Sequence, residues 1–190
     1  MKSIAEYEGR LLGHVEALYR PGERELAIEL VQALGCAISD TGFKGDAAHE
    51  TFLAVHPDPE DKTPGNNVFY ISEIRPEQLA LEDGLKRLSA ENADVAAVLA
   101  GYREVARTKP FGVPHFALRF RSGQEIEAAA DRLNGPLREK LGERLHFRIF
   151  RPDDPDAAVP GTITQAFLYQ DVIVSGSFLM GQLIELQARA

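Results

Sequence analysis

Three side chains in the sequence have the residue types and positions of a metal site. His14 and His115 lie 101 positions apart, each near the start of a segment typical of a β-strand, and Glu185 lies in the last apolar segment of the chain. Two imidazoles and a carboxylate that converge with open coordination positions bind a divalent first-row metal. Such a metal polarises a carbonyl or chelates two adjacent oxygens of a substrate. We therefore treat His14, His115 and Glu185 as candidate metal ligands.

The alternation of side chains along these strands predicts which residues share a face. Successive residues of a strand point to opposite faces, so His115 lies on the same face as Arg119, and His14 on the same face as Glu16. The other face of each strand is apolar and suits packing against a helix. If the sheets curve, the polar faces line a common cavity. Arg119 then either holds an anionic group of the substrate or pairs with a carboxylate such as Glu16.

The two histidines belong to an internal repeat. The same offset relates Gly22 to Gly123, and each glycine precedes an amphipathic segment with near-helical spacing, although the first segment is apolar over more than one stripe. Turn residues then separate three β-like segments in each half. Both halves are therefore predicted to follow the order β-α-β-β-β. The predicted helices are Glu23–Leu34 and Gln124–Leu133, and the strands after them are Cys36–Asp40, Thr51–His56, Val68–Ile74, His146–Arg151, Thr162–Val174 and Gly181–Gln187.

A segment rich in Leu, Ala, Glu and Lys separates the two halves. It predicts two helices, Glu77–Ala90 and Ala93–Ala106, which form a packed connector or, alternatively, a lid or a dimer contact. The predicted division of the chain is residues 1–76 for the first module, 77–110 for the connector and 111–190 for the second module.

Composition limits the classes of partner. The chain has 190 residues, 44% of them hydrophobic, with a net charge of −8, which argues against a groove that follows nucleic-acid phosphates. Cys36 is the single cysteine, so a disulfide framework and a cysteine-cluster zinc site are excluded. No run approaches the roughly 20 apolar residues that cross a bilayer, and no signal-peptide core follows Met1. We expect a cytoplasmic protein without membrane or nucleic-acid partners.

The two-half pattern resembles the vicinal oxygen chelate superfamily, which includes glyoxalase I, bleomycin resistance proteins and extradiol dioxygenases. The resemblance covers residues 10–75 and 112–188, and its best local matches are His14, His115 and the closing segment Gly181–Leu186. It implies an α+β fold in which two βαβββ modules form a curved, half-open mixed sheet around a central cavity, with the helical connector added. It also implies a homodimer, and the sequence leaves open whether the modules pair within one chain or between chains.

The resemblance also implies a ligand set. His14, His115 and Glu185 would hold a divalent ion, namely Zn, Ni, Fe(II), Mn or Co. A fourth ligand would come from the last strand of the first half, where Glu73 is favoured on chemistry and Tyr70 is the alternative. The two residues are three apart, so a regular strand cannot point both into the cavity.

Three functions are compatible with this resemblance. A glyoxalase-like isomerase or lyase would bind a small oxygenated metabolite through the metal, with Glu73 or Glu185 as the general base. An extradiol dioxygenase would use ferrous iron, with Tyr169 as a catalytic tyrosine and His56 or His146 as the additional histidine. A drug- or ligand-binding module on the same fold would need neither metal nor catalysis. In a purely structural role, the inner polar residues would pair only with one another.

Overall fold

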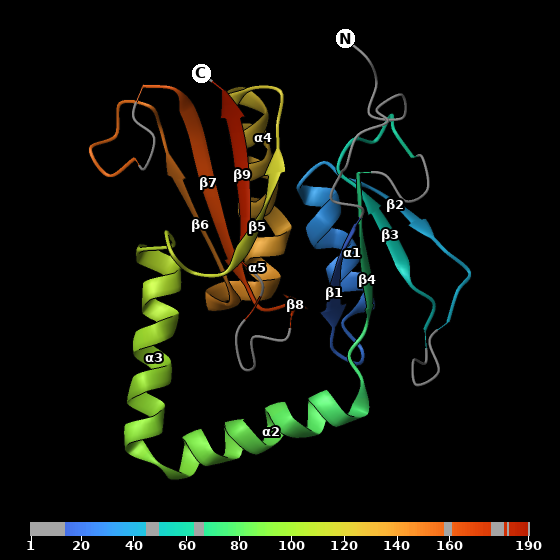
Figure 1. The fold of residues 1–190 in the computed structure, drawn as a ribbon, viewed down its shortest axis with the longest axis vertical. Coiled ribbons are helices and arrows are strands. Elements are labelled where there is room, and N and C mark those ends of the chain that lie inside the picture. The colour runs from blue at the N-terminus through green and yellow to red at the C-terminus, as the bar shows by residue number, and fades with distance from the viewer. Residues whose placement is uncertain are drawn as a thin grey trace.

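The protein has an α+β fold built on two separate sheets (Figure 1). The computed structural model describes residues 14–44, 50–62, 67–157, 161–175, 181 and 183–189, and among residues 183–189 it describes only the side chain of Ile184. The predicted α+β class is confirmed. In the described part of the chain neither sheet is closed or curled, so the curved, half-open sheet remains a prediction.

The first half forms the strand–helix unit that the repeat predicts. Gly22 adopts a left-handed conformation (φ 80°), which a glycine reaches without steric cost, and turns the chain from the first strand into the first helix. The first sheet has the strand order β2-β3-β4-β1-β8, with β1 parallel to β4. Its elements from this half are β1 (His14–Tyr19), α1 (Arg24–Ala33), β2 (Ala37–Asp40), β3 (Leu53–His56) and β4 (Val68–Glu73).

The second half repeats this pattern of strand pairing. The second sheet has the order β5-β9-β7-β6, and β5 is parallel to β9, just as β1 is parallel to β4. The other pairs within each half are antiparallel. The first half follows the predicted order β-α-β-β-β, and the second half adds the short helix α5 and the strand β8 to that order. The elements are β5 (His115–Arg119), α4 (Gly123–Arg132), a segment kinked at Gly135 (Leu133–Leu137), α5 (Arg138–Leu141), β6 (Leu145–Phe150), β7 (Ile163–Gln170), β8 (Ile173–Val174) and β9 (Leu183–Arg189).

A buried glutamine divides the strand predicted over Thr162–Val174. The fully buried Gln170 side chain accepts hydrogen bonds from the backbone N–H groups of Val172 and Ile173 and donates to the carbonyl of Ile173. This turn ends β7 and directs β8 into the first sheet, where β8 pairs with β1. The second half therefore contributes one strand, β8, to the first sheet.

The connector consists of two helices, as the sequence predicts. α2 (Pro76–Glu91) runs along the bottom of Figure 1, and α3 (Ala93–Thr108) turns upward beside the second sheet. Asn92 caps α3, because its side chain accepts from the N–H groups of Asp94 and Val95. α2 is tied to the body by the buried carboxylate of Glu82, which pairs with Arg20. Among the described residues no helix is long and apolar enough to cross a membrane.

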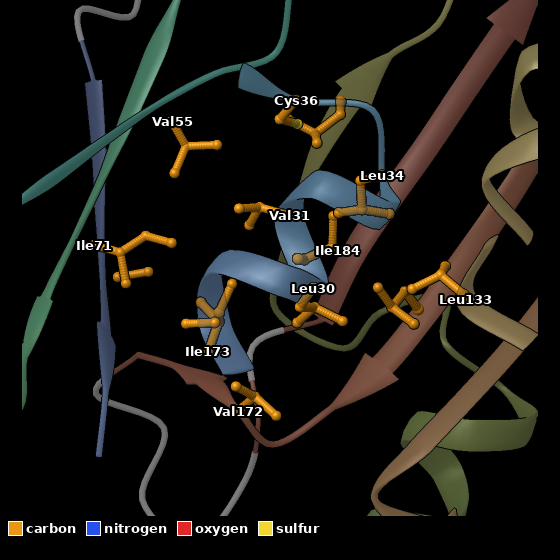
Figure 2. Close-up of a cluster of buried hydrophobic side chains, with 14 of the residues drawn as sticks. Leu30, Val31, Leu34, Cys36, Val55, Ile71, Leu133, Val172, Ile173 and Ile184 are labelled. Carbon is orange, nitrogen blue, oxygen red and sulfur yellow. The ribbon is translucent and has the colours of Figure 1, made fainter. Parts of the chain in front are cut away.

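The core lies between the sheets and is centred on α1. Val31 and Leu30 belong to one cluster that also contains Ile71 of the first sheet and Ile184 of the second (Figure 2). The rings of Phe69 on β4 and Phe116 on β5 meet with their centroids 5.3 Å apart. Each sheet therefore turns its helix-covered face, which we call the inner face, towards the other half.

Candidate functional site

The outer face of the first sheet carries a polar group of residues around His14. The register of β1 and β4 sets Glu16 opposite Tyr70, so both share the outer face with His14. The His14 and Tyr70 rings meet edge to face, with centroids 5.4 Å apart, and the Ser72 hydroxyl donates to Glu16 Oε1 at 3.0 Å. Tyr70, the alternative fourth ligand, is thus the one that adjoins His14.

Glu73 lies on the opposite face of β4 from Tyr70. It is buried and pairs in register with Tyr19, a core residue that is 1% exposed. Burial raises the pKa of the Tyr19 phenol, and the charge of Glu73 adds to that rise, whereas the hydrogen bond from Arg24 opposes it. The first sheet therefore does not bring Glu73 together with His14.

His115 lies on the outer face of the second sheet, at the exposed start of β5. Its Nδ1 is 2.6 Å from the carbonyl oxygen of Val113. Because a carbonyl only accepts, Nδ1 donates, and in the neutral ring Nε2 then carries the lone pair. The His115 ring also meets Phe167 edge to face, with centroids 5.5 Å apart. The hydrogen bond and this ring contact together orient the His115 imidazole.

Tyr169 and His146 share this outer face. The two residues are opposite each other in the register of β7 and β6. Tyr169 is buried, and the Arg107 guanidinium of α3 lies 5.0 Å from its ring centroid. Burial lowers the pKa of His146, and the positive charges of Arg107 and Arg138 lower it further. α3 therefore covers the part of the face that holds the tyrosine.

The predicted carboxylate ligand Glu185 is placed here only by its backbone. It lies opposite Ala117 in the register of β9 and β5, and its side chain lies outside the described residues. Its role as a ligand therefore stays a prediction.

A single chain does not gather the two histidines into one site. His14 and His115 are both on outer faces, whereas the Phe69–Phe116 contact sets the inner faces against each other. The two imidazoles thus point away from opposite sides of the core. Within the described ranges, no three His, Cys, Asp or Glu side chains are grouped to hold a metal ion. Because the Glu185 side chain lies outside these ranges, the ligand set of His14, His115, Glu185 and Glu73 stays a prediction.

A cavity of about 570 Å³ lies where the two halves meet. Its walls come from the end of α1, the segment after β3, the end of β5 and one side of α4. Arg119, the predicted substrate-binding residue, is one of its lining residues. The volume falls in the range typical of small-molecule sites. The other lining residues that matter for its chemistry are Leu34, Cys36, Asp58, Glu60, Leu118, Phe120, Arg121, Glu125 and Arg132.

The carboxylates in this cavity gather around one arginine. Arg121 Nη2 lies 3.6 Å from Asp58 and 3.9 Å from Glu60, and the backbone N–H of Arg121 donates to Glu125 Oε2 at 3.0 Å. In the described structure neither Arg119 nor Arg132 forms an ion pair. Arg132 instead donates from Nε to the carbonyl of Ala33 at 2.7 Å, at the C-terminal end of α1. Two guanidinium groups therefore line the cavity without a carboxylate partner among the described residues.

The buried thiol of Cys36 also lines the cavity. Burial raises its pKa to about 12, although the nearby Arg132 guanidinium acts in the opposite direction. The thiol therefore remains protonated at neutral pH and behaves as part of the apolar wall rather than as a nucleophile.

The sequence predicts a role for Arg119 but gives no indication of Arg132 or of the cavity. Arg132 lies near the end of a helix, where a basic residue is ordinary, and its partner carbonyl is 99 residues away in the sequence. The clearest sequence signal was the close pair of arginines at the end of the second-half strand, Arg119 and Arg121.

Comparison of the chain with known protein families, with curated proteins and with solved structures found no match.

Proposed function

We propose that this chain is a small-molecule-binding protein that holds an organic acid in the cavity between its two halves. The observation that carries the proposal is the unequal distribution of charge around the cavity. The acidic residues Asp58 and Glu60 lie beside Arg121, whereas Arg119 and Arg132 have no carboxylate partner in the described ranges. A carboxylate or phosphate group between two guanidinium groups accepts charge-assisted hydrogen bonds from both.

The remaining walls suit an apolar body on the ligand. Leu34, Leu118 and Phe120 line the same cavity, and the uncharged thiol of Cys36 adds to this surface. Burial of apolar ligand surface contributes about 25 cal/mol per Å². A ligand with one anionic group and a ring or branched chain therefore matches the cavity better than a small inorganic anion does.

The test compares matched ligands on matched variants. Isothermal titration with benzoate, phenyl phosphate and the neutral benzyl alcohol should give binding of one or both anions and none of the alcohol. Arg119→Gln should weaken binding about 10- to 100-fold, since a hydrogen bond to a charged group is worth roughly 1.5–3 kcal/mol. Arg75→Gln, at an exposed arginine outside the cavity, serves as the control. Equal affinity for the alcohol, or an unchanged affinity in Arg119→Gln, would contradict the proposal.

A second candidate is the metal-dependent enzyme of vicinal oxygen chelate type, with a glyoxalase-like isomerase or lyase favoured over a dioxygenase. The matching pairing of β1 with β4 and of β5 with β9 supports it, because the resemblance implies two such modules. Because His14 and His115 lie on the outer faces of the two sheets, we place this site between two copies of the chain. The first module of one chain would then adjoin the second module of its partner, with His14 and His115 facing a shared cavity inside a curved sheet.

Metal content and complementation test this second candidate. Wild-type protein purified without oxygen should carry about one divalent ion per chain, and His14→Ala and His115→Ala should each lose it. When the two variants are mixed and allowed to exchange subunits, about a quarter of the sites should return, because half of the dimers are mixed and each mixed dimer has one intact site. Full metal occupancy in either single variant, or no recovery after exchange, would argue against a site shared between chains.

A further inference from the structure

The connector carries most of the exposed large hydrophobic side chains of the described structure. Five of the seven large hydrophobic residues that are exposed in these ranges lie on α2 and α3, and the other two are Phe43 and Phe111. Scattered exposed hydrophobic residues are ordinary, but a concentration on one element marks an interaction surface. The five residues are Leu81, Leu88, Val98, Tyr102 and Val105.

Three of these residues form one stripe along α3. Val98, Tyr102 and Val105 are spaced by four and three residues, which sets them on one side of a helix, and they are 75%, 43% and 41% exposed. We call these three residues the α3 stripe. Another side of the helix buries Ala106 against the second sheet, so α3 is already anchored. The spacing of the stripe is that of a two-helix seam.

Gly101 provides a hole beside the stripe. A Cβ atom added at Gly101 would meet no heavy atom within 4 Å, so the position is open. Glycine inside a helix is destabilising relative to alanine, and nothing in the described chain requires it at this position. The adjacent Tyr102 supplies a ring of a size to enter the same hole on a second copy.

The charges at the two ends of α3 complement each other. Asp94 lies seven residues before Gly101 and the exposed Lys109 lies eight residues after it. At 1.5 Å per residue both lie roughly 10–12 Å from the glycine along the helix. Two copies of α3 that cross antiparallel at Gly101 therefore set each Asp94 beside the partner's Lys109. The antiparallel arrangement also opposes the two helix dipoles favourably.

We propose that α3 is the interface of a homodimer, in which the α3 stripes of two copies pack antiparallel across a two-fold axis at Gly101. Each Tyr102 ring covers the Gly101 of the other copy, and Val98 of one copy lies beside Val105 of the other. The interface is isologous, so every contact occurs twice. It does not depend on which small molecule the cavity binds.

The mass of the full chain in solution tests the proposal. Sedimentation velocity at 1–100 μM should give about twice the chain mass of 20.9 kDa for the wild type. Val98→Asp should shift the dimer dissociation constant upward at least 30-fold, whereas Ala100→Asp, an exposed position on the opposite side of α3, should leave it within threefold. A wild type that is monomeric at 100 μM, or equal effects of both variants, would overturn the proposal.

Two further variants distinguish this packing from unspecific stickiness. Gly101→Phe fills the hole and should give monomers, whereas an unspecific apolar surface would associate more strongly with the added ring. In a Cys36→Ala background, chains with Val98→Cys should cross-link to chains with Val105→Cys upon oxidation, and more rapidly than either variant with itself. Faster cross-linking of Val98→Cys chains to one another would indicate parallel helices and would refute the antiparallel arrangement. A different protein bound to the α3 stripe of the wild type would refute the self-association.

Discussion

Glu82 joins the connector to both halves of the body through a single guanidinium group. The carboxylate is 1% exposed, and its Oε2 accepts hydrogen bonds from Arg20 Nε at 3.2 Å and Nη2 at 3.0 Å. Arg20 follows the first strand, and its Nη1 donates to the carbonyl of Asp171 in the turn that leads to β8. We predict that Glu82→Ala destabilises the protein by about 3 kcal/mol.

This magnitude follows from what the variant leaves behind. Removal of one partner of a buried ion pair costs roughly 3–5 kcal/mol, because the other charge is left without compensation. The Arg20 side chain is 16% exposed and keeps its bond to Asp171, so the lower end of the range applies. Glu82→Gln keeps one accepting oxygen and loses the charge, and it should cost about half as much, about 1.5 kcal/mol.

Urea unfolding at pH 7, followed by circular dichroism, measures these differences. The adjacent Asp83→Ala is the matched control, because Asp83 pairs with Lys86 at 3.2 Å on the exposed side of the same helix. An exposed pair of this kind contributes roughly 0–1 kcal/mol. A loss below 1 kcal/mol in Glu82→Ala, or a loss equal to that of the control, would refute the view that α2 is held by this buried pair.

Two other predictions concern titrating groups. With a thiol pKa of about 12, roughly one Cys36 side chain in 10⁴ is ionised at pH 8, whereas about one in four is ionised for an ordinary thiol. Because the thiolate is the reactive form, iodoacetamide should alkylate native protein more than 10³-fold more slowly than protein in urea. A native rate within tenfold of the unfolded rate would show that the thiol is accessible. Burial lowers the pKa of both His56 and His146 in the folded protein. Below about pH 6.5 the unfolded chain therefore binds more protons at these two residues than the folded chain does. The free energy of unfolding should consequently fall as the pH drops from about 6.5 towards 5. The double variant His56→Gln/His146→Gln should flatten this slope, and an equally steep slope in that variant would assign it to other groups.

The parts of the fold that the sequence predicts well are those that local patterns decide. Gly22 and Gly123 mark the starts of the two helical segments, and the connector between the halves forms two helices, as predicted. The strand break at Gln170 was missed, because it depends on one buried amide that satisfies the backbone of the turn after it. A glutamine between apolar residues gives no local sign of that role.

The packing of the two halves was not predicted, although the sequence contains a signal for it. The first predicted helix is apolar over more than one stripe, which is unusual for a helix with one buried side. In the structure α1 contacts both halves: Val31 and Leu30 lie in one cluster with Ile71 of the first sheet and Leu133 of the second half. A helix covered on two sides lies inside the molecule. The polar faces with His14 and His115 must then face outward, away from the core.

A comparison of equivalent positions in the two halves shows where they differ in charge. α4 buries Ile126, Ala129 and Ala130 at the positions where α1 buries Ala27, Leu30 and Val31, so the helices correspond with an offset of 99 residues. At that offset Arg132 corresponds to Ala33, whose carbonyl it contacts, and the strand offset relates Arg119 to Leu18. Arg132 bonds across the junction to the first half, whereas Arg119 forms no ion pair in the described ranges. The cations that line the cavity therefore belong to the second half alone, which supports the proposal that an anionic ligand binds at the junction between the halves.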